Sequence, residues 1–148
     1  MKKLTIEKEL KRLEKILFSK SNRSLAYSTD DWFDLIKPDP GVYGWFENGK
    51  LIYIGETGNL RKRIKDAFRT RNHSFRRHLG NDRLKHFKGF TIGTTKDNFP
   101  DKIERSLDKT MKKLEVSVVP IAFGRKEFEE YIYDKHKDSL TNIRGKRI

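Results

Sequence analysis

Residues 41–63 read GVYGWFENGKLIYIGETGNLRKR, and this stretch carries the strongest structural signal in the chain. Two β-prone runs, 42–46 and 51–54, flank Asn48-Gly49, a dipeptide that readily adopts the positive φ angles of a tight hairpin turn. A capping segment then begins a strongly basic helix, which we expect over 59–70. The stretch therefore predicts an antiparallel hairpin that leads directly into a helix.

The remainder of the chain predicts helices packed around this hairpin. Apolar side chains recur at helical spacing in three segments, and a further β-prone run supplies a third strand. Helices are expected at 1–18, 100–114 and 125–137, a helical turn at 32–36, strands at 116–123 and, more weakly, 90–95, and a polar loop at 19–31. We expect one α+β domain over 1–148: a three-stranded antiparallel sheet flanked by helices, with a helical extension at 1–40.

The composition is that of a basic, folded domain. Among 148 residues, 34 Lys and Arg stand against 21 Asp and Glu, which leaves a formal charge of +13. Ten Phe, five Tyr and two Trp supply the apolar side chains that a disordered chain lacks. The absence of Cys excludes disulfides, thiolate-bound zinc and a thiol nucleophile. No apolar run approaches the roughly 18 residues of a membrane span, so we expect no membrane partner and a cytoplasmic location.

Most of the positive charge follows the hairpin directly. Residues 59–88 hold eleven Lys and Arg against two Asp, which accounts for +9 of the total. Such a density of cations is typical of a surface that follows a nucleic-acid backbone, where contacts to phosphate give affinity without reading sequence. The residues expected to bind nucleic acid are Arg61, Lys62, Lys65, Arg69, His73, Arg76 and Arg77.

Two tyrosines and an arginine surround the predicted hairpin. Tyr43 lies on the first strand and Tyr53 on the second, so both hydroxyls can face one side of the sheet. The helix that begins beyond Gly55 presents backbone N–H groups and Arg63 to an anion such as phosphate. A carboxylate from the last helix could hold a divalent cation at the same surface. Hydrolysis of a phosphodiester needs these parts: an activated water and positive charge beside the phosphoryl oxygens.

This arrangement resembles the GIY-YIG nuclease family. Gly41-Val42-Tyr43 and Tyr53-Ile54-Gly55 are similar to the two tripeptides of the family, with Val42 in place of the usual Ile. Arg63 follows the second tripeptide by eight residues, as the helix Arg of the family does.

The resemblance continues towards the C-terminus. The segment 128–133, which contains Glu129, is similar to the metal-binding helix of the family, and Asn142 is similar to the Asn that follows that helix. The resemblance thus covers a core at about 41–142. Within that core, residues at about 71–114 correspond to a helical insertion.

The resemblance implies a metal-dependent endonuclease that cleaves DNA. Tyr43 would act as general base or in the relay that deprotonates the attacking water, and Tyr53 would position the water or the phosphate. Arg63 would stabilise charge on the phosphoryl group, and Glu129 would bind one Mg²⁺ or Mn²⁺. Supporting roles fall to Gly55 and Asn142.

Three alternatives stay open. Glu130 could be the metal ligand instead of Glu129, because the segment up to Asn142 is one residue longer than usual in the family and lacks the usual Pro. A non-catalytic module that binds DNA or RNA on the same scaffold would carry the same charge. RNA would also serve as well as DNA on charge alone, since both polymers have the same phosphate. The sequence indicates no protein partner.

Overall fold

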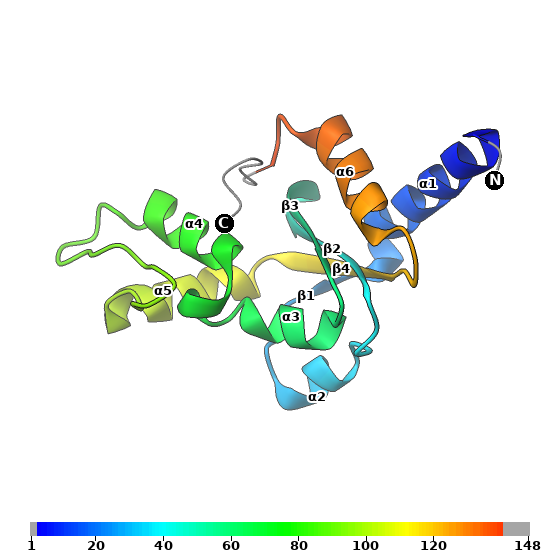
Figure 1. Ribbon diagram of the computed structural model, residues 1–148. Helices are drawn as coiled ribbons and strands as arrows, with labels where there is room; N and C mark the ends of the chain where they lie inside the picture. The colour runs from blue at the N-terminus through cyan, green and yellow to red at the C-terminus, as the bar shows by residue number, and fades with distance from the viewer. Residues whose placement is uncertain (1–2, 141–148) are drawn as a thin grey trace.

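A four-stranded antiparallel sheet forms the centre of the computed structural model, which describes residues 3–140 (Figure 1). The strands are β1 (Arg23–Leu25), β2 (Gly41–Glu47), β3 (Lys50–Thr57) and β4 (Glu115–Pro120). Their order across the sheet is β1-β4-β2-β3, so β2 and β4 are the inner strands. The α+β fold class, the hairpin and the strand predicted at 116–123 are confirmed.

The sheet has one strand more than predicted, and that strand comes from the expected loop at 19–31. Strand β1 pairs with β4 in the register Arg23↔Ser117. Asn22 reinforces this edge, because its Nδ2 donates to Ser117 Oγ at 2.7 Å and to the carbonyl of Val118 at 2.9 Å. A three-residue edge strand is too short for an alternating pattern to be recognised in the sequence.

The weaker strand expected at 90–95 is wrong, since that segment has no regular structure. The side chain of Asn81 replaces a strand partner there. Asn81 Nδ2 donates to the carbonyl of Gly93 at 3.2 Å, and the Gly93 N–H donates to Asn81 Oδ1 at 3.1 Å. The segment is therefore fastened to a helix instead of to the sheet.

Helices cover both faces of the sheet. The α-helices are α1 (Lys3–Phe18), α2 (Asp30–Asp34), α3 (Leu60–Asp66), α4 (Ser74–Arg83), α5 (Asp101–Lys112) and α6 (Arg125–His136), and the short 3-10 helices are η1 (Lys20–Asn22) and η2 (Thr70–Asn72). Helices α1 and α6 pack on one face, and α2 to α5 pack on the other (Figure 1). None of the helices within residues 3–140 is long and apolar enough to cross a membrane.

Two apolar clusters follow from this layering. On the α1 and α6 face, Leu17 and Phe128 pack around Phe46 of the hairpin. On the opposite face, Trp45 packs with Phe75 of α4, their ring centroids 5.7 Å apart. The hairpin strands β2 and β3 contribute side chains to both clusters, which explains why they read as nearly continuous apolar runs.

The turn and one bulge set the register of the hairpin. Asn48 and Gly49 form the two-residue turn with φ angles of 50° and 78°, as the dipeptide predicted. Tyr53 pairs with Trp45, but the next pair is Phe46 with Leu51, so the residue between Leu51 and Tyr53 bulges. Tyr53 therefore shares a face with Trp45, while Phe46 and Leu51 turn to the opposite cluster.

Glycine is required at position 55, where the second tripeptide of the hairpin lies opposite the first. It pairs directly with Tyr43, and the tyrosine ring lies over its backbone. A Cβ at position 55 would meet the phenol oxygen and would lie 2.5 Å from Cζ of Tyr43, closer than real Cβ contacts allow. Only glycine leaves room for the ring, so Gly55 determines where the Tyr43 hydroxyl is held.

We predict that Gly55→Ala destabilises the fold by about 1–3 kcal/mol, because the added methyl group displaces a fully packed ring. The matched control is Gly58→Ala, since a Cβ at Gly58 meets nothing within 4 Å. Urea denaturation followed by circular dichroism measures both. Equal stability of the two variants would contradict the close packing of Tyr43 on Gly55.

Candidate active site

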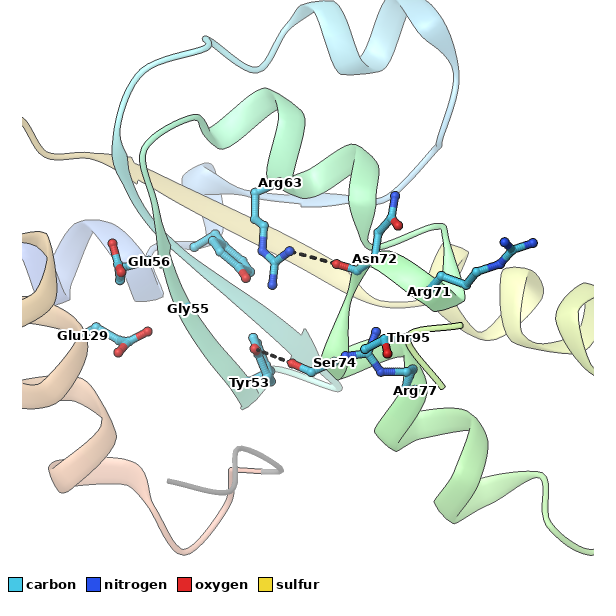
Figure 2. A pocket seen from close by; sticks show the side chains of 11 residues that line it. Tyr53, Gly55, Glu56, Arg63, Arg71, Asn72, Ser74, Arg77, Thr95 and Glu129 are labelled. Atoms are coloured by element: carbon cyan, nitrogen blue, oxygen red, sulfur yellow. Dashed lines mark hydrogen bonds between the residues drawn. The ribbon is translucent and has the colours of Figure 1, made fainter. Parts of the chain in front are cut away.

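A cavity of about 430 Å³ lies where the end of β3 meets α3, α4 and α6 (Figure 2). The four side chains predicted to be catalytic, Tyr43, Tyr53, Arg63 and Glu129, all line it. In Figure 2, Glu129 approaches from the side opposite to Arg63, with the β3 ribbon passing between the elements that carry them. Three consecutive elements, β2, β3 and α3, and the distant helix α6 thus place these residues around one space.

The two tyrosines face the same side of the sheet, as predicted. Their rings stack with centroids 6.2 Å apart and an interplanar angle of 29°. The Tyr53 hydroxyl bonds with Ser74 Oγ at 3.3 Å, which ties the hairpin to the first residue of α4. The Tyr43 hydroxyl bonds with His73 Nε2 at 3.0 Å. Both phenols are therefore held in fixed orientations at the wall of the cavity.

Burial decides the protonation of Tyr43. Burial, and to a smaller extent the neighbouring Tyr53, raises the pKa of Tyr43 well above its ordinary value, while Arg63 opposes that rise. Tyr43 is consequently a neutral phenol at pH 7. Burial makes negative charge on its oxygen costly, and the positive charge of Arg63 lowers this cost.

Two of the arginines that line the cavity, Arg63 and Arg77, are hydrogen-bonded to the same turn. Arg63 Nη1 donates to the carbonyl of Asn72 at 2.9 Å, and Arg77 Nη1 donates to the carbonyl of Thr70 at 2.9 Å. Partial burial, followed by the charge of Arg63, lowers the pKa of Arg77. Two neighbouring guanidinium groups that repel one another form a favourable site for an anion such as phosphate.

Local sequence explains how α3 delivers Arg63. Asn59 Oδ1 accepts a hydrogen bond from the N–H of Lys62 at 3.0 Å and so caps the helix. Leu60 and Ile64 are buried against the sheet and fix the rotation of the helix. Arg63 then lies on the side that faces the end of β3.

Helix α6 supplies one carboxylate to the cavity. Glu129 is 2% exposed and lines the cavity, whereas Glu130 is exposed and does not. Glu56 also lines it, but Glu56 Oε2 is paired with Arg125 Nε at 2.7 Å. Within residues 3–140, no group of three or more His, Cys, Asp or Glu side chains could hold a metal. Asn142, the predicted support of this carboxylate, lies outside the described residues.

Two of the residues expected to bind nucleic acid are buried instead. His73 has no exposed surface and contacts Tyr43. Arg76 is 1% exposed, and its guanidinium pairs with Glu104 at 3.3 Å and with Asp108 at 2.8 Å. The predicted phosphate contacts of these two residues are therefore corrected: Arg76 joins α4 to α5, and His73 supports the tyrosine.

The other predicted cations fall into two groups. Arg77 lines the cavity, and Arg69 lines a second cavity of about 360 Å³. Arg61 donates to the carbonyl of Ile36 at 2.7 Å, and Lys62 and Lys65 are exposed on α3. These last three do not line the main cavity.

Sequence reasoning missed several residues that line the cavity. Arg71, Asn72, Ser74 and Thr95 all come from the segment 71–114, which was treated as an insertion of unknown role. The only available signal was the high density of Arg after α3. The insertion is thus part of the site.

The comparisons with known proteins identify the family of the chain. The family model of the GIY-YIG catalytic domain matches residues 39–117, which is more than half of the chain. The chain belongs to the GIY-YIG family, whose catalytic domains are nucleases. The match ends before α6 and does not include Glu129. The only support for Glu129 as a site residue is therefore that its side chain lines the cavity.

Two curated relatives share short segments with the chain. UvrABC system protein C of Nautilia profundicola is 59% identical over 34 residues, covering 22% of this chain and 6% of that protein. UvrABC system protein C of Nitrosococcus oceani is 41% identical over 44 residues, covering 29% of this chain and 7% of that protein. The matched segment is thus a small part of each relative. No solved structure matches the chain significantly.

The buried His73 predicts a pH dependence of stability. Burial, together with the charges of Arg63 and Arg77, holds the pKa of His73 well below its ordinary value of 6.5. The unfolded chain therefore takes up a proton before the folded chain does, so stability present above about pH 6.5 is lost as the pH falls below it. One such group gives a slope of up to about 1.4 kcal/mol per pH unit.

Urea denaturation of the wild type and of His73→Asn between pH 7.5 and 5 checks this prediction. The wild type should lose stability more steeply below pH 6.5. Parallel slopes for the two proteins would show that His73 is not the responsible group.

Proposed function

We propose that this protein is a metal-dependent endonuclease that hydrolyses phosphodiester bonds in DNA. The observation that supports the proposal most directly is the convergence of Tyr43, Tyr53, Arg63 and Glu129 on one cavity from separate elements. Membership of a nuclease family gives the reaction class. The positive charge after the hairpin favours a polyanionic substrate.

The two arginines would bind the scissile phosphate. Their guanidinium groups are held by backbone carbonyls of the η2 turn and line the cavity from one side. In the transition state, the phosphoryl oxygens carry more negative charge, and fixed guanidinium donors stabilise it. Arg63 takes the central role because it also acts on Tyr43.

Glu129 would hold one Mg²⁺ or Mn²⁺ opposite the arginines. A single buried carboxylate at the cavity wall fits such a cation, because Mg²⁺ is commonly held by one or two carboxylates, with water and substrate phosphate as the remaining ligands. When bound, the ion would stabilise negative charge on the phosphoryl and leaving oxygens. Glu56, the other carboxylate of the cavity, forms an ion pair with Arg125.

The tyrosines would handle the attacking water. Tyr43 is the candidate base, and its buried oxygen needs the positive charge of Arg63 to carry negative charge. Tyr53 is braced by Ser74 and would orient the water or the phosphate by a hydrogen bond. Arg71 and Thr95, which also line the cavity, would contact the nucleotides beside the cleaved bond.

We predict that Glu129→Gln lowers the cleavage rate of plasmid DNA in Mg²⁺ or Mn²⁺ by at least about 100-fold, because a neutral amide binds a divalent cation poorly. Glu130→Gln is the matched control, since Glu130 adjoins Glu129 but is exposed. The control should keep wild-type activity. Equal loss in both variants, or loss only in Glu130→Gln, would contradict Glu129 as the metal ligand.

We predict that Arg63→Ala lowers the cleavage rate by about 100- to 1,000-fold, the usual effect of removing one transition-state donor. Arg105→Ala is the matched control, because Arg105 is an exposed arginine of α5 that does not line the cavity. Filter binding of the same DNA separates turnover from affinity. Tight, salt-dependent binding by the wild type without cleavage of duplex or branched DNA in either metal would favour a non-catalytic module, and preferred cleavage of RNA would correct the substrate.

A further inference from the structure

His73 lies behind the reactive tyrosine, with both ring nitrogens engaged. The side chain has no exposed surface and precedes α4 as its N-cap. Its Nδ1 accepts a hydrogen bond from the N–H of Phe75 at 3.1 Å, and its Nε2 lies 3.0 Å from the Tyr43 oxygen. The imidazole also packs against the rings of Tyr43 and Tyr53, with centroids 5.9 and 5.7 Å away.

The bond to Phe75 determines which nitrogen carries the proton. A backbone N–H can only donate, so Nδ1 must present a lone pair. A neutral imidazole has a single N–H, which must then be on Nε2. Burial and the charges of Arg63 and Arg77 lower the pKa of His73, so the neutral form is the one present. The Nε2–H therefore donates to Tyr43, and the tyrosine oxygen accepts.

This direction of donation has a consequence for the tyrosine. Because His73 has no lone pair to offer, the hydroxyl proton of Tyr43 cannot point at it. The backbone of Gly55 lies under the ring, and the cavity lies on the side that Arg63 and Glu129 also line. The other polar neighbours of the Tyr43 oxygen are Tyr53 and Arg63, and both line the cavity, so the hydroxyl proton is directed to that side.

We propose that His73 is a positioning residue whose Nε2–H fixes the Tyr43 oxygen and sets the path of proton transfer towards the cavity. The proposal rests on the nuclease function proposed above. In the step it serves, the hydroxyl proton of Tyr43 has already passed to solvent through the cavity. The tyrosine oxygen then takes a proton from the attacking water as the water oxygen bonds to phosphorus, and the bond to the leaving oxygen breaks with its electron pair. Throughout, the Nε2–H bond stabilises the negative oxygen.

Two variants separate this role from helix capping. In His73→Asn, the side-chain oxygen replaces Nδ1 as the acceptor for Phe75 but no donor reaches Tyr43. In His73→Gln, an amide N–H can occupy about the position of Nε2. We expect His73→Asn to fold and to lower kcat by about 10- to 100-fold with little change in KM, the usual effect of losing such a supporting bond. His73→Gln should recover most of this loss.

The pH profile provides a readout that packing alone would not change. Loss of the donor should raise the pKa of Tyr43 further and move the rising limb of kcat to higher pH in His73→Asn. The other charged and titratable groups around the cavity are Tyr53 and Glu56 of β3, Arg63 of α3, Arg71 of η2, Arg77 of α4 and Glu129 of α6, and they are the same in all three proteins. Equal losses in the Asn and Gln variants with unshifted profiles would overturn the positioning role.

The tautomer can be tested without any activity. ¹⁵N NMR of the imidazole in the wild-type protein distinguishes a protonated Nε2 from a protonated Nδ1. We expect the Nε2–H form at pH 7.5, and an Nδ1–H form would overturn the inference even if the protein cleaves DNA. Conversely, an Nε2–H form in a protein that cleaves nothing would contradict the proposed function and leave the hydrogen-bond direction intact.

Discussion

The contact of the Tyr43 ring with the bare backbone of Gly55 is the constraint on which the site depends. It requires that β2 and β3 pair in one register, and the Asn48-Gly49 turn and the bulge between Leu51 and Tyr53 establish that register. A shift by one residue would turn Tyr43 to the α1 and α6 face, where Phe46 packs. The hydroxyl would then be on the wrong side of the sheet from Arg63. Fold and chemistry are thus specified by the same few residues.

The parts of the molecule that could be predicted are those with local signals. The hairpin follows from alternating β-prone runs around Asn-Gly, and the place of Arg63 follows from a cap and a buried helical stripe within seven residues. The convergence of the tyrosines also follows from strand geometry, because side chains on paired strands share a face. Glu129 could not be separated from Glu130 by sequence, because only the structure shows that Glu129 is buried at the cavity and Glu130 is exposed.

The parts that could not be predicted depend on partners far along the chain. Strand β1 exists because β4 offers an edge about 90 residues later, and three residues carry no pattern of their own. Arg76 looked like any other cation in a basic run, but Glu104, 28 residues away, and Asp108 neutralise it in the interior. His73 was assigned to phosphate for the same reason, since sequence shows charge density but not which side chains point inward. The contribution of 71–114 to the cavity likewise depends on the fold, which brings residues of this segment next to the tyrosines of the hairpin.

The attachment of Arg63 and Arg77 to the η2 turn has an entropic consequence. A free arginine loses much rotational freedom when it binds phosphate, and that loss weakens binding. Here the carbonyls of Asn72 and Thr70 already restrict both side chains. Most of the entropy cost of ordering them therefore arises on folding and not on binding an anion. The two guanidinium groups also brace the turn between them. An anion that relieves their mutual repulsion should therefore make the turn more rigid, and the cavity wall should stiffen as substrate arrives.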